Sequence, residues 1–262
     1  MLTLKHVSKT FFPGTPNARL ALDDLSLHLD KGEFVTVIGS NGAGKSTLLN
    51  AVAGAFLVDR GHILLDGEDV TFLKDYQRSR VIGRLFQDPL SGTAPSMTIE
   101  ENLTLAYMRS SGHAPLFGLK RADRARLRER VAALGLGLED RMNTRVGQLS
   151  GGQRQALTLL MATLVTPKLL LLDEHTAALD PATAETVLEL TKRVIRENGI
   201  TCLMITHNMQ SSLRLGSRTI MMDAGRIVLD VAGEERGRMT VSDLLARFGQ
   251  AADNDRMLLG TV

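Results

Sequence analysis

The chain has 262 residues, 44% hydrophobic and 23% charged, which is ordinary for a globular protein and long enough for one large α/β domain with an inserted lobe. Its formal net charge of +2 argues against a nucleic-acid-binding protein, because such proteins usually carry a strong basic excess. The single cysteine, Cys202, cannot form an internal disulfide, so we expect a reducing compartment and a small buried side chain.

Two short stretches of alternating polar and apolar residues open the chain, at residues 2–7 and 21–29, on either side of a Pro/Gly-rich loop at 13–17. This alternation predicts half-buried antiparallel strands. Residues 33–38 contain FVTVI, a β-branched run typical of a central parallel strand. A glycine-rich loop and an apolar helical stretch at 48–55 follow. This order of strand, loop and helix is the one that a phosphate-binding βα unit requires.

Helical patterns replace strand patterns over about residues 88–155. We expect one helix at 98–107, with two glutamates in its first turn, where the helix dipole favours negative charge. A loop containing Gly and Pro at 110–118 separates it from an amphipathic helix at 121–134. We interpret this segment as an inserted, mostly helical subdomain.

Parallel-strand patterns return at residues 169–172 and 201–206, and a helix that Pro181 opens is expected between them at 182–197. The longest apolar stretch, 156–172, is interrupted by a Pro-Lys pair, so it predicts a helix, a turn and a buried strand. A membrane span requires about 20 uninterrupted apolar residues. We therefore expect any role at a membrane to come through a partner.

The last part of the chain predicts a β-hairpin and little beyond it. Strand patterns at 220–222 and 227–229 flank a turn that contains Gly225. Residues 239–262 predict one short helix and a polar tail. We therefore take residues 1–238 as the main domain.

The loop GSNGAGKS matches the pattern G-x-x-x-x-G-K-[ST] and predicts a site for ATP. The glycines allow successive backbone N–H groups to curl around the phosphates, and the helix N-terminus adds its partial positive charge. Lys45 would reach the phosphate oxygens, and the Ser46 hydroxyl would bind Mg²⁺. The loop residues predicted to contact ATP are Gly39, Ser40, Asn41, Gly42, Ala43, Gly44, Lys45, Ser46 and Thr47.

The sequence LLLLDE ends a predicted buried strand with two carboxylates, Asp173 and Glu174. In open α/β sheets the ligand binds at the carboxyl ends of the strands. Asp173 is suited to hold Mg²⁺ through water, and Glu174 is suited to polarise the attacking water as the catalytic base. Acidic residues after strands also cap helices, so LLLLDE indicates a catalytic site only in combination with the glycine loop.

Residues 149–153 read LSGGQ and precede a predicted helix at 154–164. A serine and two glycines at a helix start form a second anion site. One nucleotide cannot easily occupy two phosphate cradles in one compact domain, so we infer a head-to-tail dimer, in which this loop of one copy covers the γ-phosphate held by the other. The residues of this loop are Leu149, Ser150, Gly151, Gly152 and Gln153.

The glycine loop, LSGGQ and LLLLDE, in this order and spacing, resemble the nucleotide-binding subunit of ABC transporters over about residues 1–235. The resemblance implies an α/β fold: a P-loop NTPase (RecA-like) core with an N-terminal antiparallel β subdomain and an inserted α-helical subdomain. It also implies roles for Gln87, which would bind Mg²⁺, sense the γ-phosphate and face the membrane partner, and for Asp180 in the loop that crosses the dimer interface. His207 resembles the switch histidine that contacts the γ-phosphate.

Two further positions are read from the resemblance. Phe11 matches the aromatic residue that stacks on adenine, with the neighbouring Phe12 as a competitor. His175 follows Glu174 at the place where most relatives carry proline, a departure that still allows the strand to turn.

The resemblance implies an ATP hydrolase that drives solute transport, as a dimer with a second copy of itself and peripheral to the cytoplasmic face of the inner membrane. Its phrases GSNGAGKSTLLNAVAG and LLDEHTAALDP are similar to a subgroup of importers labelled as tryptophan/tyrosine or uncharacterised uptake. That subgroup works with an integral-membrane permease related to the branched-chain amino-acid type and an extracytoplasmic solute-binding protein. The implied solute is an amino acid or a similar small organic molecule.

Three alternatives are an exporter ATPase, a soluble ABC ATPase of DNA repair or translation, and a P-loop kinase. Repair ATPases carry a long coiled coil between the two halves of the site, whereas only a short segment separates Gln87 from Leu149. Translation factors carry two cassettes in one chain, and this chain has one. A kinase leaves LSGGQ unexplained. The residues do not distinguish import from export.

Overall fold

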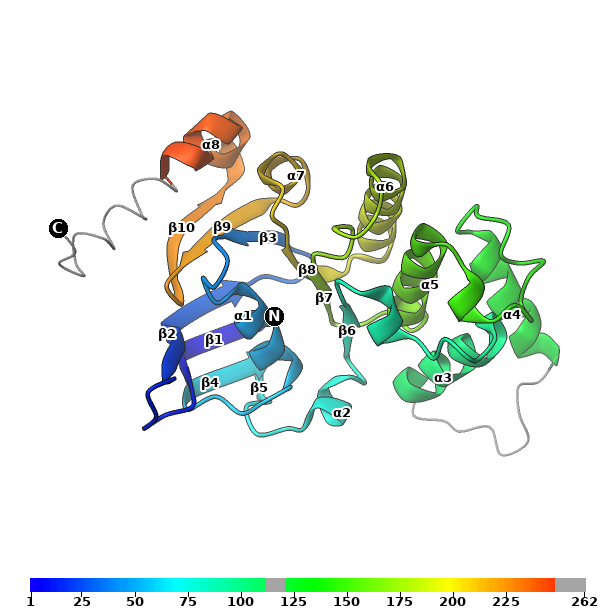
Figure 1. The fold of residues 1–262 in the computed structure, drawn as a ribbon, viewed down its shortest axis with the longest axis horizontal. Coiled ribbons are helices and arrows are strands. Elements are labelled where there is room, and N and C mark those ends of the chain that lie inside the picture. The colour runs from blue at the N-terminus through cyan, green and yellow to red at the C-terminus, as the bar shows by residue number, and fades with distance from the viewer. Residues whose placement is uncertain (112–120, 248–262) are drawn as a thin grey trace. The chain divides into compact units, whose positions relative to one another are not determined.

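The structure is a computed structural model that describes residues 1–111 and 121–247. They form two compact units (Figure 1): the first comprises Met1–Arg78 and the described residues from Thr201 onward, and the second is Ser79–Ile200. In the described part of the chain, no helix combines the length and the apolar character that crossing a membrane requires.

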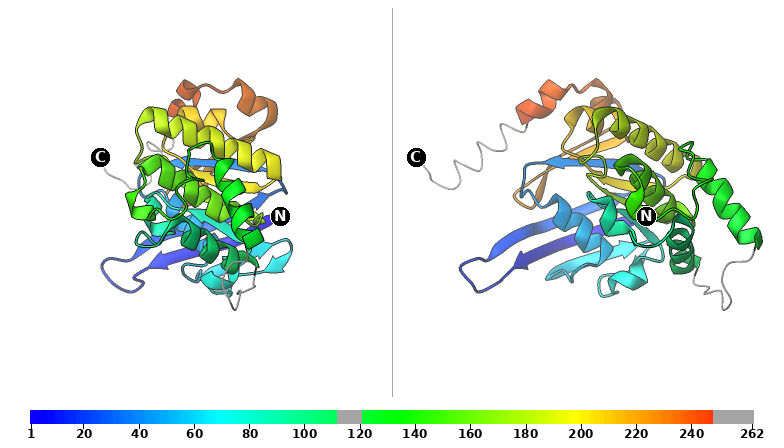
Figure 2. Two further views of the ribbon diagram at one scale, coloured as in Figure 1. Left: turned by 90° about the vertical axis from the view of Figure 1, so that its right-hand side faces the viewer. Right: turned by 45° about the vertical axis from the view of Figure 1, so that its right-hand side comes forward.

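An antiparallel sheet lies in the first unit, with β2 at one edge and β5 at the other (Figure 2, blue and cyan strands). Its strands, in spatial order, are β2 (Arg19–Leu29), β1 (Leu2–Phe11), β4 (Arg60–Leu65) and β5 (Glu68–Asp69). The predicted antiparallel pair is confirmed. Both strands run further than their alternation indicated, and the register between them shifts at three places after Leu4.

The first unit also contains two of the predicted parallel strands. Strand β3 (Phe34–Gly39) pairs in parallel with β8 (Thr201–Ile205) and with β9 (Arg218–Asp223), and β10 (Arg226–Ala232) completes the expected hairpin with β9. Residues 34–38 of β3 and the whole of β8 are buried, as an apolar, β-branched run predicts for central strands. Cys202 lies fully buried in β8, as expected.

Short helices surround these strands. The glycine loop leads into α1 (Lys45–Ala53), whose C-terminal end is capped by Gly54 in the left-handed conformation. Three further short helices of this unit were not predicted, because one or two turns give no clear periodicity. They are α2 (Asp75–Arg78), α7 (Met209–Arg214) and α8 (Gly233–Arg238).

In its described residues, the second unit combines two parallel strands with four long helices. The strands are β6 (Ile82–Leu85) and β7 (Leu169–Asp173). The helices are α3 (Ile99–Ser111), α4 (Arg121–Ala132), α5 (Gly151–Thr163) and α6 (Pro181–Asn198). Helices α3, α4 and α5 share an apolar core, to which Leu103, Val131 and Leu157 each contribute a buried side chain.

Two predicted boundaries in this unit are wrong. Helix α3 continues to Ser111 and so replaces the start of the predicted loop at 110–118, whose remaining residues lie outside the described ones. Helix α5 begins at Gly151, not at 154, because Ser150 caps it and the glycines form its first turn. Residues 241–247 are helical, and the rest of the predicted tail lies outside the described residues.

Candidate functional site

The glycine loop between β3 and α1 is closely fitted to its surroundings in the first unit. Gly39 and Gly44 have φ angles of +150° and +99°, which side-chain-bearing residues rarely adopt. A Cβ added at Gly39 would meet the Met222 carbonyl oxygen at 2.2 Å, and one at Gly44 would meet that of Ala21 at 2.5 Å. The loop therefore requires glycine at both positions.

Lys45 is buried, and its Nζ atom lies inside the loop. This Nζ donates to the carbonyl oxygens of Gly39 and Ser40, both at 2.8 Å. The next residue, Ser46, is exposed in the first turn of α1. The loop thus brings an ammonium group, the start of a helix and a hydroxyl together, which suits a nucleotide phosphate and a hard cation.

His207 lies at the same strand edge as this loop. Strands β3 and β8 run in parallel, and Thr206 N donates to Val37 O at 3.1 Å, so both strands end at one edge. His207 is exposed immediately beyond β8. The structure therefore places His207 at the sheet edge where β3 leads into the glycine loop.

Phe11 is half-buried at the end of β1. Its ring contacts Phe56 edge-on, with centroids 5.3 Å apart, and Lys9 Nζ lies 5.7 Å from its centroid. Phe12 is 68% exposed and has a left-handed backbone, with a φ of +51°. Phe11 is thus the ring held in place, and Phe12 the one left in solvent.

In the second unit, the parallel pairing of β6 and β7 gathers three predicted residues at one edge. Leu85 lies opposite Leu172, so Gln87 follows β6 at the edge where Asp173 ends β7 and Glu174 follows it. Arg84 Nη2 lies 3.7 Å from Asp173 Oδ2. Sequence reasoning missed Arg84, since its contact with Asp173 depends on which strands are neighbours.

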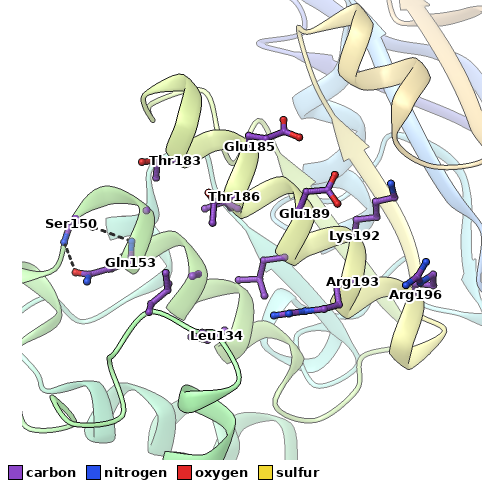
Figure 3. Close-up of a pocket in the computed structure, with 15 residues that line it drawn as sticks. Leu134, Ser150, Gln153, Thr183, Glu185, Thr186, Glu189, Lys192, Arg193 and Arg196 are labelled. Carbon is purple, nitrogen blue, oxygen red and sulfur yellow. Dashed lines mark hydrogen bonds between the residues drawn. The ribbon is translucent and has the colours of Figure 1, made fainter.

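Helix α5 starts with a complete capping box. Ser150 Oγ accepts from Gln153 N, and Gln153 Oε1 accepts from Ser150 N, both at 3.2 Å (Figure 3). Ser150 and Gly151 are exposed at this helix start. Arg154 donates to three carbonyl oxygens of the preceding turn, those of Val146, Gly147 and Leu149, and so holds that turn.

The loop before α6 packs against the start of α5. A Cβ added at Gly151 would lie 3.0 Å from Leu179 Cδ2, and one added at Gly152 would lie 2.2 Å from Thr183 Cγ2. Asp180 caps α6 by accepting from Thr183 N at 3.1 Å, and its hydrogen bonds with Thr183 lower the pKa of the carboxyl. The LSGGQ loop and the loop of Asp180 are therefore neighbours in one unit.

A pocket of about 820 Å³ lies between α5 and α6 in the same unit (Figure 3). Ser150 and Gln153 line one end, and Lys192, Arg193 and Arg196 line the other. No residue of the glycine loop lines this pocket, so it is distinct from the phosphate cradle of the first unit.

His175 is a second residue whose contacts the sequence did not reveal. It is 1% exposed, and burial lowers the pKa of its imidazole to about 4. Its Nε2 lies 3.1 Å from Thr191 Oγ1 in α6. The residue directly after Glu174 is therefore a buried histidine with a neutral imidazole ring.

A glycine loop between a parallel strand and a helix, together with two carboxylates at the end of a buried strand, defines a P-loop ATPase. Residues 22–177, more than half of the chain, match the family described as ABC transporter. The chain belongs to the ABC transporter family, as an ATP-hydrolysing, ATP-binding cassette.

Curated relatives support the same family. The chain is 45% identical to a tyrosine transport ATP-binding protein of Clostridioides difficile, over 96% of this chain and 100% of that protein. It is 37% identical to methionine import ATP-binding proteins of Caulobacter vibrioides and Haemophilus influenzae. The alignments cover 97% and 87% of this chain, and 74% and 64% of those longer proteins.

Solved structures agree in fold. A dimeric ATP-binding cassette in a post-hydrolysis state with ADP and Pi has a TM-score of 0.76 and 30% identity, covering 88% of this chain and 98% of that chain. The ADP conformation of another ABC transporter cassette has a TM-score of 0.77 and 26% identity, covering 95% and 98%. The predicted α/β fold, a P-loop NTPase core with antiparallel β and helical subdomains, is confirmed.

Proposed function

We propose that this chain is the ATP-hydrolysing subunit of an amino-acid importer, in which two copies form a head-to-tail dimer that drives a separate integral-membrane permease. One observation carries the proposal: each chain holds two helix starts suited to phosphate, before α1 and before α5, and they belong to different units. A second copy allows one nucleotide to engage both kinds of loop. The dimeric cassette among the similar structures supports this arrangement.

The first unit would bind ATP through the glycine loop. The backbone N–H groups of residues 39–47 and the ammonium of Lys45 would hold the β- and γ-phosphates, in a cradle where added Cβ atoms have no room. Phe11 would stack on adenine, since its ring is fixed against Phe56. His207, at the same strand edge, would contact the γ-phosphate.

Three oxygen-bearing side chains fit the needs of Mg²⁺: the Ser46 hydroxyl, the Gln87 amide and the Asp173 carboxylate. When bound, Mg²⁺ would neutralise charge on the phosphate oxygens. Glu174, beside Asp173, would orient the attacking water and accept its proton. The exposed Ser150 and Gly151 of one copy would cover the γ-phosphate held by the other copy, and Asp180 would lie near that contact.

ATP would favour the closed dimer, because it gains contacts from both copies only in that state. Hydrolysis would remove those contacts and reopen the dimer. The permease would couple this cycle to the solute, at the cytoplasmic face of the membrane, and an extracytoplasmic solute-binding protein would deliver the solute. The full-length likeness to a tyrosine transport protein supports an aromatic amino acid as the solute.

The experiment compares wild type with Glu174→Gln. We expect the variant to lose turnover by about 100-fold or more, as removal of a general base does. It should still dimerise with ATP, since the phosphate contacts remain, and size-exclusion chromatography with light scattering would measure this. Glu189→Gln, an exposed position on α6 in the same unit, is the matched control and should behave as wild type. Rapid hydrolysis by Glu174→Gln, or a monomer in ATP, would contradict the proposal.

The solute is tested separately, in cells that carry either wild type or Glu174→Gln. We expect uptake of labelled tyrosine to fall in the variant, with methionine as the comparison because two relatives import it. Unchanged uptake of both amino acids would exclude them as solutes while leaving the ATPase assignment intact.

A further inference from the structure

We propose that His175 is a positioning residue for ATP hydrolysis, which fastens the chain just after Glu174 to helix α6 through Thr191. The inference rests on the proposed role of Glu174 as the base. The ring would hold the backbone that carries the Glu174 carboxylate in place, without touching the nucleotide itself.

The backbone at Glu174 needs such a fastening. Its φ is +46°, a left-handed conformation that is unfavourable for a residue with a side chain. Strain of this kind persists only where the surrounding structure holds it. In the turn that follows, Ala177 N donates to Glu174 O at 2.9 Å and Leu179 N donates to Thr176 O at 3.2 Å. Neither of them ties this turn to the core.

The contact between His175 and Thr191 supplies that tie. Thr191 donates its hydroxyl proton to Val187 O at 2.8 Å, one turn earlier in α6. Its oxygen must therefore accept from His175 Nε2, 3.1 Å away, so the imidazole proton is on Nε2. Nδ1 is then an acceptor, and it is buried without a hydrogen-bond partner among the described residues.

A buried His175 ring with an unpaired Nδ1 is unfavourable if its only role is to fill space in the core. A buried acceptor without a donor lowers stability, and an apolar side chain of similar volume would fill the same space without that cost. What imidazole adds is a directional bond to a rigid helix, which fixes the angle of the ring. Because residues 174 and 175 share a peptide bond, holding His175 limits how far the Glu174 Cα can shift, and the carboxylate shifts with it. Small displacements of a catalytic group cost rate.

Steady-state ATPase assays on the full chain test the tie with paired variants. Thr191→Val removes the acceptor at nearly constant shape, and Thr191→Ser keeps it. His175→Asn removes the donor that reaches α6, and His175→Gln keeps an N–H at a similar reach. We expect the Val and Asn variants to lower kcat about fivefold with KM for ATP changed less than about twofold, and the Ser and Gln variants to keep most of kcat.

Thr186→Val is the matched control. Thr186 lies in the same helix and donates its hydroxyl to Ala182 O at 3.0 Å, four residues earlier, but it is exposed and makes no hydrogen bond to a histidine in the part of the chain that is described. An equal loss in Thr186→Val and Thr191→Val, a change confined to KM, or no loss in Thr191→Val would overturn the inference. Glu174→Gln separates the two proposals: if it still hydrolyses ATP, the proposed function fails as well.

A second measurement needs no change in activity. In wild-type chain labelled with ¹⁵N-histidine, the His175 signals should show a protonated Nε2 and an unprotonated Nδ1, and loss of these signals in His175→Asn would assign them. A proton on Nδ1 would overturn the inference even if every variant folded poorly.

Discussion

Replacing Gly152 by alanine should destabilise the second unit, because the new methyl group would enter space that Thr183 occupies. The added Cβ would lie 2.2 Å from Thr183 Cγ2, whereas ordinary contacts begin near 3.4 Å, so the two groups must separate by about 1 Å. Both lie near helix starts, where α5 packs on α6. We therefore expect the substitution to lower the free energy of unfolding, whatever its effect on catalysis.

The size of the effect can be bounded from this contact. Overpacking of this kind costs about 1–3 kcal/mol, and the better helix propensity of alanine offsets at most about 1 kcal/mol. Thr183→Ser removes the clashing atom and leaves Thr183 Cβ as the nearest neighbour, at 3.6 Å. The double variant should therefore regain about 1–2 kcal/mol relative to the sum of the single changes.

Urea unfolding of the four proteins, followed by circular dichroism, measures this coupling. Gly151→Ala is the control, because its Cβ would meet only the far end of Leu179, at 3.0 Å, which can move aside. A midpoint for Gly152→Ala equal to that of wild type would refute the packing argument. So would a double variant no more stable than additivity allows.

Arg78→Met should lower the free energy of unfolding by about 3 kcal/mol and lower Tm, because it removes the four hydrogen bonds that the buried guanidinium donates to backbone carbonyls. Thr71→Val should reduce the dependence of the free energy of unfolding on acidic pH. Hydrogen bonds from Thr71 lower the pKa of Asp69 to about 2, so the stabilisation by the ionised Asp69 is present above about pH 4 and lost as pH falls through 2. Since the Asp69 side chain is 44% exposed, we expect this contribution to the free energy of unfolding to be about 1 kcal/mol, and urea titrations at several pH values would measure it. Gly44→Ala should weaken ATP binding and stability more than Gly42→Ala, because its Cβ meets a backbone oxygen instead of a movable arginine; equal Kd values would contradict this.

Elements with strong local signals could be predicted from the sequence. Helix α6 carries an Asp-Pro start, and its bounds differ from the predicted ones by one residue at each end. Strand β3 has a β-branched run that only burial on both faces explains. Strand β4 was missed, since it is stabilised by pairing with β1, where Leu4 lies opposite Ile63, and that register is invisible in a short window.

The residues of the candidate site also fall into those that could be predicted from the sequence and those that could not. The glycine loop, LSGGQ and LLLLDE are each a continuous run of residues, so their members could be named from the sequence alone. The contacts that hold them in place link distant residues: Arg84 with Asp173, and His175 with Thr191, sixteen positions apart. The left-handed backbone of Glu174 had no signal either, since glutamate has no preference for that conformation.

Helix α6 links the two loops of the second unit that the proposed mechanism needs to keep in register. Thr183, in its first turn, packs against Gly152 at the start of α5, and Thr191, two turns later, accepts from His175 beside Glu174. A shift of α5 along α6 would therefore strain the first contact, and a rotation of α6 would strain the second. The LSGGQ loop and the segment after Glu174 can move together with α6 at little cost, whereas separating them breaks packed contacts. Within this unit, the base and the signature loop should behave as one rigid body.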